Sequence, residues 1–161
     1  MTLMLHAWGA YPTYPTSKTK WRPEDWQVNR MIHAIKGEPF KGYASGVRDI
    51  YGNTHTINQG ARPTALRIFG MWAVNRLEEL GHTNVILVPV PSSDHVNRIE
   101  DFTGRMMIGA LMNQAKVRRL EGIKAAPVLT FREAMPKASK GGSGSRDEGR
   151  LLDNLVCHQS T

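Results

Sequence analysis

Apolar side chains recur at helical spacing in two segments of the N-terminal half. The first begins at Pro23, where a proline and two acidic residues suit the start of a helix, and it ends at Gly37. The second runs from Pro63 to Gly81, a glycine placed where a helix C-cap belongs. The apolar positions that define these two helices are Trp26, Met31, Ile32, Ile35, Ala65, Phe69, Trp72, Ala73 and Leu80. Residues 38–60 between them are rich in Gly and Asn, which predicts turns and short extended pieces.

The pattern changes in the second half of the chain. Residues 85–91 form a continuous apolar run, typical of a central strand buried on both faces of a parallel sheet. A Met-rich helix is expected over about residues 100–116, and a second short strand over residues 127–131. Residues 2–8 are a further candidate strand, and residues 151–157 mark ordered structure after a polar loop. This succession predicts an α/β layered fold.

The composition of the chain predicts its net charge and the cellular compartment that it suits. The 161 residues carry 21 Lys and Arg against 14 Asp and Glu, a formal net charge of +7, and this length predicts one domain. The positive excess predicts a polyanionic partner: nucleic acid, a phosphorylated small molecule or acidic lipid. The lone Cys157, expected to be a core thiol, excludes a disulfide framework and favours the reducing cytoplasm. The N-terminus has the features of neither a signal peptide nor a membrane span, so no membrane partner is expected.

The loop after the predicted central strand is the first candidate site. Ser92, Ser93 and Asp94 stand there, and ligands of open α/β sheets bind beyond the carboxyl ends of the strands. The two hydroxyls and the backbone N–H groups suit a phosphate. The same residues also suit an ordinary loop in which Ser or Asp caps the next helix, and the sequence leaves both interpretations open.

A second candidate is the Lys/Gly/Ser-rich segment near residue 140. A positive flap of this composition can close over an anionic substrate and exclude water, and a plain linker has the same composition. Its cations are Lys137, Lys140, Arg146 and Arg150, the last two sharing a face if a helix starts near Ser145.

A third candidate is the acidic pair Glu100 and Asp101, which precedes Thr103 and Gly104. Such a group can hold ribose hydroxyls, a magnesium ion or a phosphate, and acids at this place also complement a helix N-terminus. The six histidines show no paired metal spacing, so no zinc site is expected.

Three segments of the chain resemble, in the same order, parts of the phosphoribosyltransferase-like domain of the competence protein F family. Residues 31–37 resemble the helix with an apolar–Lys–Gly ending that opens that domain. Residues 85–91 resemble its first core strand and Pro-Val-Pro diphosphate loop. Residues 131–154 resemble its flexible loop, in which a serine-led, Arg-rich turn precedes an Asn and a strand. The chain has no counterpart of the family's Cys-rich zinc ribbon or of its acidic strand with a Thr-Thr-Gly turn.

This resemblance implies a three-layer phosphoribosyltransferase-like α/β fold with a mainly parallel sheet, incomplete at the C-terminus. Residues 23–161 would form that domain, with a flexible basic loop at 134–150, after an N-terminal strand and arm at 1–22. The implied site is Mg²⁺-assisted and takes 5-phosphoribosyl-1-diphosphate or a related nucleotide, with glycosyltransferase chemistry if the protein is active. Because the acidic ribose-binding motif has no counterpart, binding is implied and catalysis is left undecided.

The same resemblance implies roles for the candidate residues. The diphosphate would be bound by residues that face it or close over it: Ser92, Ser93, Asp94, Lys137, Lys140, Arg146 and Arg150. The ribose would be bound by Glu100, Asp101 and Thr103. Cations on a closing flap stabilise the charge that develops on a leaving diphosphate, which agrees with these roles.

A function of another class fits the same charge. The protein would be a non-catalytic, basic protein that binds nucleic acid or a partner protein in a larger assembly. The partner could be a second protein that completes the fold or a second copy of this chain. A further alternative is that the protein is a regulatory inhibitor that mimics half of an enzyme. Early aromatic side chains can stack on bases or can pack the N-terminal arm onto the domain: Trp8, Tyr11, Tyr14, Trp21 and Trp26.

Overall fold

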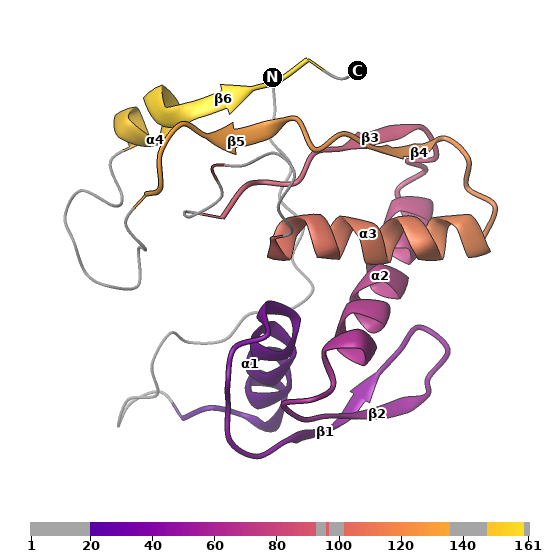
Figure 1. Cartoon of the computed structure of the whole chain (residues 1–161). Helices are drawn as coiled ribbons and strands as arrows, with labels where there is room; N and C mark the ends of the chain where they lie inside the picture. Colours follow the sequence, from indigo (N-terminus) through magenta and orange to yellow (C-terminus); the bar gives the residue numbers. More distant parts are fainter. Residues whose placement is uncertain (1–19, 93–95, 97–101, 136–147, 160–161) are drawn as a thin grey trace. The chain divides into compact units, whose positions relative to one another are not determined.

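A computed structural model describes residues 20–92, 96, 102–135 and 148–159 of the chain. It divides into two compact units, an N-terminal unit (Met1–Arg76) and a C-terminal unit (Leu77–Thr161), which we describe separately (Figure 1). The strand expected over residues 2–8 lies outside the described residues. No helix in the described part of the chain is both long enough and apolar enough to span a membrane.

The N-terminal unit begins with the predicted helix α1 (Pro23–Lys36). Asp25 is buried in its first turn, where its carboxylate accepts hydrogen bonds from the Arg22 backbone N–H at 2.8 Å and from the Arg22 guanidinium at 3.1 Å. The guanidinium and the backbone N–H of Arg22 together hold the pKa of Asp25 below its usual value. At the other end Gly37 adopts φ 71°, a left-handed conformation that glycine adopts without strain, so the helix stops as expected.

A hairpin of β1 (Ala44–Arg48) and β2 (Thr54–Ile57) packs on α1. A β-bulge at Gly46, with φ 78°, adds a residue to β1, so that Ala44 and Val47 both face the core although they are three positions apart. These two residues and Ile57 bury the inner face of the hairpin, where His55 lies opposite Val47. Exposed side chains remain on its outer face.

The turn between β1 and β2 is organised by one buried carboxylate. Asp49 accepts hydrogen bonds from the backbone N–H groups of Tyr51 at 2.9 Å and Asn53 at 3.0 Å. It also pairs with the Asn53 amide at 3.1 Å and the His55 ring at 2.9 Å. The His55 hydrogen bond is the main reason that the pKa of Asp49 falls to about 2.

Helix α2 (Arg62–Glu79) starts in the N-terminal unit and ends in the C-terminal unit. Its N-terminal part is tied to α1, because the Arg62 guanidinium donates to the carbonyl of Ile35 at 3.0 Å. It is tied to β1 as well, since the Trp72 indole N–H donates to the carbonyl of Arg48 at 3.1 Å. Its buried Ala65, Ile68, Ala73 and Val74 complete the core of this unit.

The C-terminal unit is built around a β–α–β succession. Strand β3 (Val85–Leu87) leads into α3 (Thr103–Val117), and β4 (Ile123–Ala125) then returns parallel to β3. Strand β5 (Leu129–Phe131) pairs antiparallel with β6 (Leu155–Cys157), and α4 (Glu148–Asn154) directly precedes β6. Mixed α/β structure is therefore confirmed.

Strands β4 and β5 form nearly one extended segment, with β5 continuing the course of β4 in Figure 1. Backbone groups of Gly122 and Ala126 bond to β3, while those of Val128 and Arg132 bond to His158 and Asn154 beside β6. The segment is interrupted between the two strands, because the backbone N–H of Val128 donates to the carbonyl of Ala126 at 2.8 Å in a three-residue turn around Pro127. β3 therefore pairs with one part of this segment and β6 with the other.

Two expectations for this unit need revision. The run 85–91 is not buried on both faces, because Ile86 and Val90 are 68% and 76% exposed and β3 covers only three residues. Cys157, expected in the core, is exposed on β6. Of the three strand pairs in the described residues one is parallel, so a mainly parallel, three-layer sheet is not established.

Candidate anion-binding site

The carboxyl side of β3 and the start of α3 are in close contact. A Cβ atom added to Gly104 would lie 2.9 Å from the carbonyl oxygen of Val90, a separation that no side chain tolerates. Because Gly104 has no side chain, the first turn of α3 can pack directly against the backbone of Val90, which follows β3. The backbone at the two ends of the loop 91–102 is therefore close together. These ends lie at the carboxyl side of a parallel strand and at a helix N-terminus, which is where α/β proteins bind ligands.

Two of the sequence candidates in this loop fall within the described residues. Ser92 is half-buried next to the buried Pro91, and Thr103 is the first residue of α3, directly before the contact of Gly104 with Val90. The structure thus brings Ser92 and Thr103 to the two ends of one loop. The remaining candidates of this region, Ser93, Asp94, Glu100 and Asp101, lie outside the described residues.

A second part of the site is a cavity of about 550 Å³ at the end of β5. Its charged lining consists of two arginines and two carboxylates, all on exposed residues. Arg150, one of the predicted flap cations, is among them, whereas Lys137, Lys140 and Arg146 lie outside the described residues. The lining residues are Arg132, Glu133, Gly149, Arg150, Asp153 and Asn154.

One buried side chain, Asn154, holds this cavity together. Its Oδ1 accepts hydrogen bonds from the backbone N–H groups of Arg132 and Glu133, both at 3.1 Å, and its Nδ2 donates to the carbonyl of Glu133 at 2.9 Å. Only 7% of Asn154 is exposed. The side chain thereby fixes the backbone that carries Arg132 against the end of α4, which carries Arg150.

The two parts of the site lie toward the same end of the strands. β3 is parallel to β4, and β5 continues the course of β4, so the chain leaves β3 and β5 in the same direction (Figure 1). Ser92 follows the first of these ends and Arg132 the second. β3 and β5 do not pair with each other, since β3 pairs with β4 and β5 with β6, so the two places share a direction along the strands and no hydrogen-bonded strand pair joins them.

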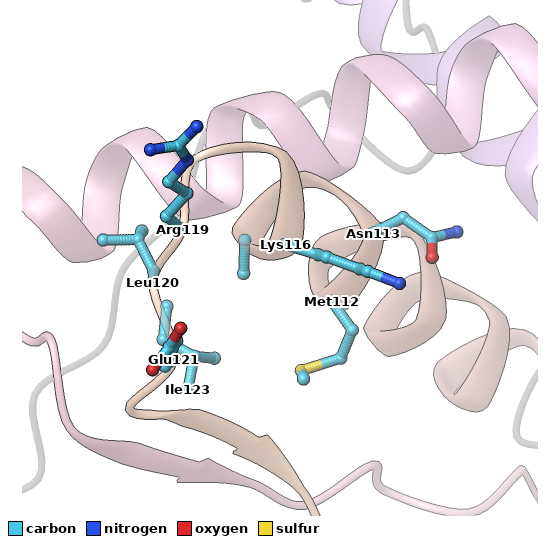
Figure 2. Close-up of a pocket in the computed structure, with 8 residues that line it drawn as sticks. Met112, Asn113, Lys116, Arg119, Leu120, Glu121 and Ile123 are labelled. Carbon is cyan, nitrogen blue, oxygen red and sulfur yellow. The ribbon is translucent and has the colours of Figure 1, made fainter.

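A second cavity of the C-terminal unit, of about 490 Å³, lies between α3 and β4 and contains none of the predicted residues (Figure 2). Met112 and Ile123 face into this space, while the Arg119 side chain points away from them and Lys116 points in another direction. Its two cations, Lys116 and Arg119, therefore do not point toward one place in this cavity.

The described residues contain no group of three or more His, Cys, Asp and Glu side chains that could hold a metal ion. Mg²⁺, however, is commonly bound by one or two carboxylates together with the phosphates of a ligand. Glu133 and Asp153 in the cavity lining are two such carboxylates. The lining therefore fits a Mg²⁺ ion that arrives with a diphosphate, and it does not form a metal site by itself.

Sequence reasoning overlooked two of these features. No local sequence signal marks Asn154 as buried, because its hydrogen-bond partners Arg132 and Glu133 lie 22 and 21 positions away. Nor does the sequence around Gly104 mark it as a point of close packing, since the carbonyl that it approaches belongs to Val90.

Comparisons with protein-family models, with curated proteins and with solved structures gave no match.

Proposed function

We propose that the C-terminal unit binds a phosphorylated ribose compound, 5-phosphoribosyl-1-diphosphate or a related nucleotide, as a phosphoribosyltransferase-like domain. One observation carries the proposal: the carboxyl sides of β3 and β5 point the same way, one toward Ser92 and the N-terminus of α3, the other toward a cavity with two arginines. Backbone N–H groups at the first place and guanidinium groups at the second are both suited to phosphate oxygens. The proposal concerns binding and leaves catalysis aside.

The distribution of charge in the cavity favours a diphosphate that carries its own metal ion. Arg132 and Arg150 can form charge-assisted hydrogen bonds with phosphate oxygens. The nearby Glu133 and Asp153 would repel a bare diphosphate, and a bound Mg²⁺ reverses that repulsion because it takes carboxylate and phosphate oxygens together. We therefore expect binding to depend on Mg²⁺. The three-layer, mainly parallel arrangement of this unit belongs to the same proposal.

Isothermal titration calorimetry of the full chain with 5-phosphoribosyl-1-diphosphate tests the proposal, with and without Mg²⁺. We expect saturable heat only with Mg²⁺, and an affinity about tenfold lower or more for each of Arg132→Gln and Arg150→Gln, since hydrogen bonds to charged groups contribute about 1.5–3 kcal/mol. Lys124→Gln is the matched control, because Lys124 is an exposed cation of β4 that does not line the cavity. Absence of heat, or equal losses in all three variants, would refute the proposal.

A further inference from the structure

The positive charge of the chain is concentrated in the N-terminal unit. Residues 1–76 carry ten Lys and Arg against four Asp and Glu, a net charge of +6, whereas residues 77–161 carry eleven against ten, a net charge of +1. A polyanionic partner is therefore expected to meet the N-terminal unit. The proposed diphosphate site lies in the other unit and does not account for this excess.

Within the N-terminal unit, the β1–β2 hairpin and the three residues before it expose two cations, Lys41 and Arg48, and no carboxylate. Its one acidic residue, Asp49, is 6% exposed and is satisfied by the turn and by His55. Lys41, just before β1, and Arg48, at the end of β1, are exposed and have no ion-pair partner among the described residues. Both charges are therefore available to a ligand.

The same hairpin exposes two tyrosines. Tyr43 is 67% exposed and Tyr51 is 66% exposed, the first beside β1 and the second in the turn. Because Val47 faces the core, its neighbour Arg48 points to the outer face, opposite Thr54 in the register. We define the outer face of the hairpin as Lys41, Tyr43, Arg48, Tyr51, Thr54 and Thr56, all of them exposed.

We propose that the outer face of the hairpin binds single-stranded nucleic acid. Exposed aromatic rings interleaved with cations are the arrangement that single strands require, because bases stack on the rings while phosphates meet the charges. Base stacking is tolerant of sequence, so recognition would be largely independent of base composition. Tyr43, Tyr51 and Arg48 carry the proposal, and it stands independently of the ribose-phosphate site.

This surface differs from the one that the sequence suggested. Trp21 packs against Trp26 with ring centroids 4.4 Å apart. The guanidinium of Arg30 lies 5.3 Å from the Trp26 ring and 5.2 Å from the Phe40 ring, so it stacks with both. These aromatic rings of α1 and its flanking residues already contact one another or a cation, whereas no ring contact engages Tyr43 or Tyr51 within the described residues.

Fluorescence anisotropy of the full chain with a labelled oligothymidine of about 15 nucleotides tests the proposal. We expect binding that weakens with salt, about tenfold weaker binding in each of Tyr43→Ala and Tyr51→Ala, and recovery in Tyr43→Phe and Tyr51→Phe, which keep the ring. Arg48→Gln should reduce the slope of log affinity against log salt concentration by about 0.7, the value for one phosphate of a single strand. Lys124→Gln removes the same charge from the C-terminal unit and should leave the slope unchanged.

Any of the following results would overturn the proposal. One is the absence of binding at low salt. Another is retention of full affinity when both tyrosines are replaced by alanine, which would remove stacking from the explanation. The third is an equal effect of Arg48→Gln and Lys124→Gln, or equal affinity for a duplex of the same length, because either would indicate attraction by net charge alone. A thermal melt of each variant checks that these exposed substitutions leave the unit folded.

Discussion

Replacement of Asn154 by alanine should loosen the segment that carries Arg132. The substitution removes three hydrogen bonds: two from the backbone N–H groups of Arg132 and Glu133 to Oδ1, and one from Nδ2 to the carbonyl of Glu133. Each bond contributes about 0.5–1.5 kcal/mol, so we expect a loss of about 2–4 kcal/mol in the free energy that keeps this segment closed. That corresponds to about a 30- to 1,000-fold rise in the opening equilibrium.

Amide hydrogen exchange measures this effect at single residues. The backbone N–H of Arg132 also donates to the carbonyl of Asn154, at 2.9 Å, whereas Oδ1 is the acceptor found for the N–H of Glu133. In Asn154→Ala the exchange rate of Glu133 should therefore rise more than that of Arg132. Asn154→Asp keeps the two acceptor contacts but places a carboxylate oxygen against the carbonyl of Glu133, where two acceptors repel, so its exchange rates should also exceed those of the wild type.

The control for this experiment is tryptophan fluorescence. All four tryptophans lie in residues 1–76, so an unchanged fluorescence melt shows that the N-terminal unit is intact in each variant. Unaltered protection of Glu133 in Asn154→Ala would show that the side chain does not hold this segment, and the account of the cavity given above would be wrong. The variant should also bind the ribose-phosphate ligand more weakly, because Arg132 loses its fixed backbone.

Two further substitutions test the packing of each unit. Asp49→Asn should lower the melting temperature of the N-terminal unit by about 5 °C at neutral pH, read by tryptophan fluorescence. The amide oxygen can still accept from the backbone N–H groups of Tyr51 and Asn53, but the NH2 group that replaces Oδ2 cannot accept from the Asn53 amide or the His55 ring. The pKa of Asp49 is lowered to about 2 in the folded protein, so its stabilisation is present above about pH 4 and is lost as pH falls toward 2. The Asn variant should lack that part of the acid transition, and equal acid transitions in both proteins would show that the Asp49 carboxylate does not stabilise the turn. Gly104→Ala should destabilise the C-terminal unit through the contact with the carbonyl of Val90, while Gly109→Ala, where a Cβ meets nothing within 4 Å, should stabilise it by about 0.5–1 kcal/mol in urea denaturation followed by circular dichroism. Stabilisation by both substitutions would show that the approach at Gly104 is not tight.

The helices were predictable because their signals are local. Pro23, Asp25 and Gly37 act within one or two turns of α1. For α2 the apolar spacing predicted the helix but not its buried side, because Ala65 and Ala73 are buried while Phe69, Trp72 and Leu80 are only half-buried. A helix start near Ser145 was one of the alternatives open for the basic segment, and α4 begins at Glu148. A local signal does not depend on distant parts of the chain, so the predicted bounds of α1, α2 and α3 agree with the structure to within a few residues.

The strands were less predictable because their burial depends on partners far along the chain. The run from Val85 to Pro91 has the composition of a doubly covered strand, yet Ile86 is exposed, since cover on a second face is a tertiary event. β4 was missed altogether: three residues carry too little periodicity, and what makes them a strand is parallel pairing with β3 across α3. Cys157 similarly looks apolar in sequence and lies on the exposed side of β6.

The sequence by itself determined the helices, the mixed α/β class and the net charge of +7, because each depends on neighbouring residues or on a count. Only the tertiary structure decided where that charge and those strands act. It divided the chain into one unit of net charge +6 and one of +1. In the folded protein Asp49 is buried, so the exposed charges near the hairpin are cations. The side chain of Asn154 binds the backbone beside Arg132, and Arg150, eighteen positions later in the sequence, lines the same cavity. Those outcomes follow from long-range packing and hydrogen bonding, which no local pattern of residues contains.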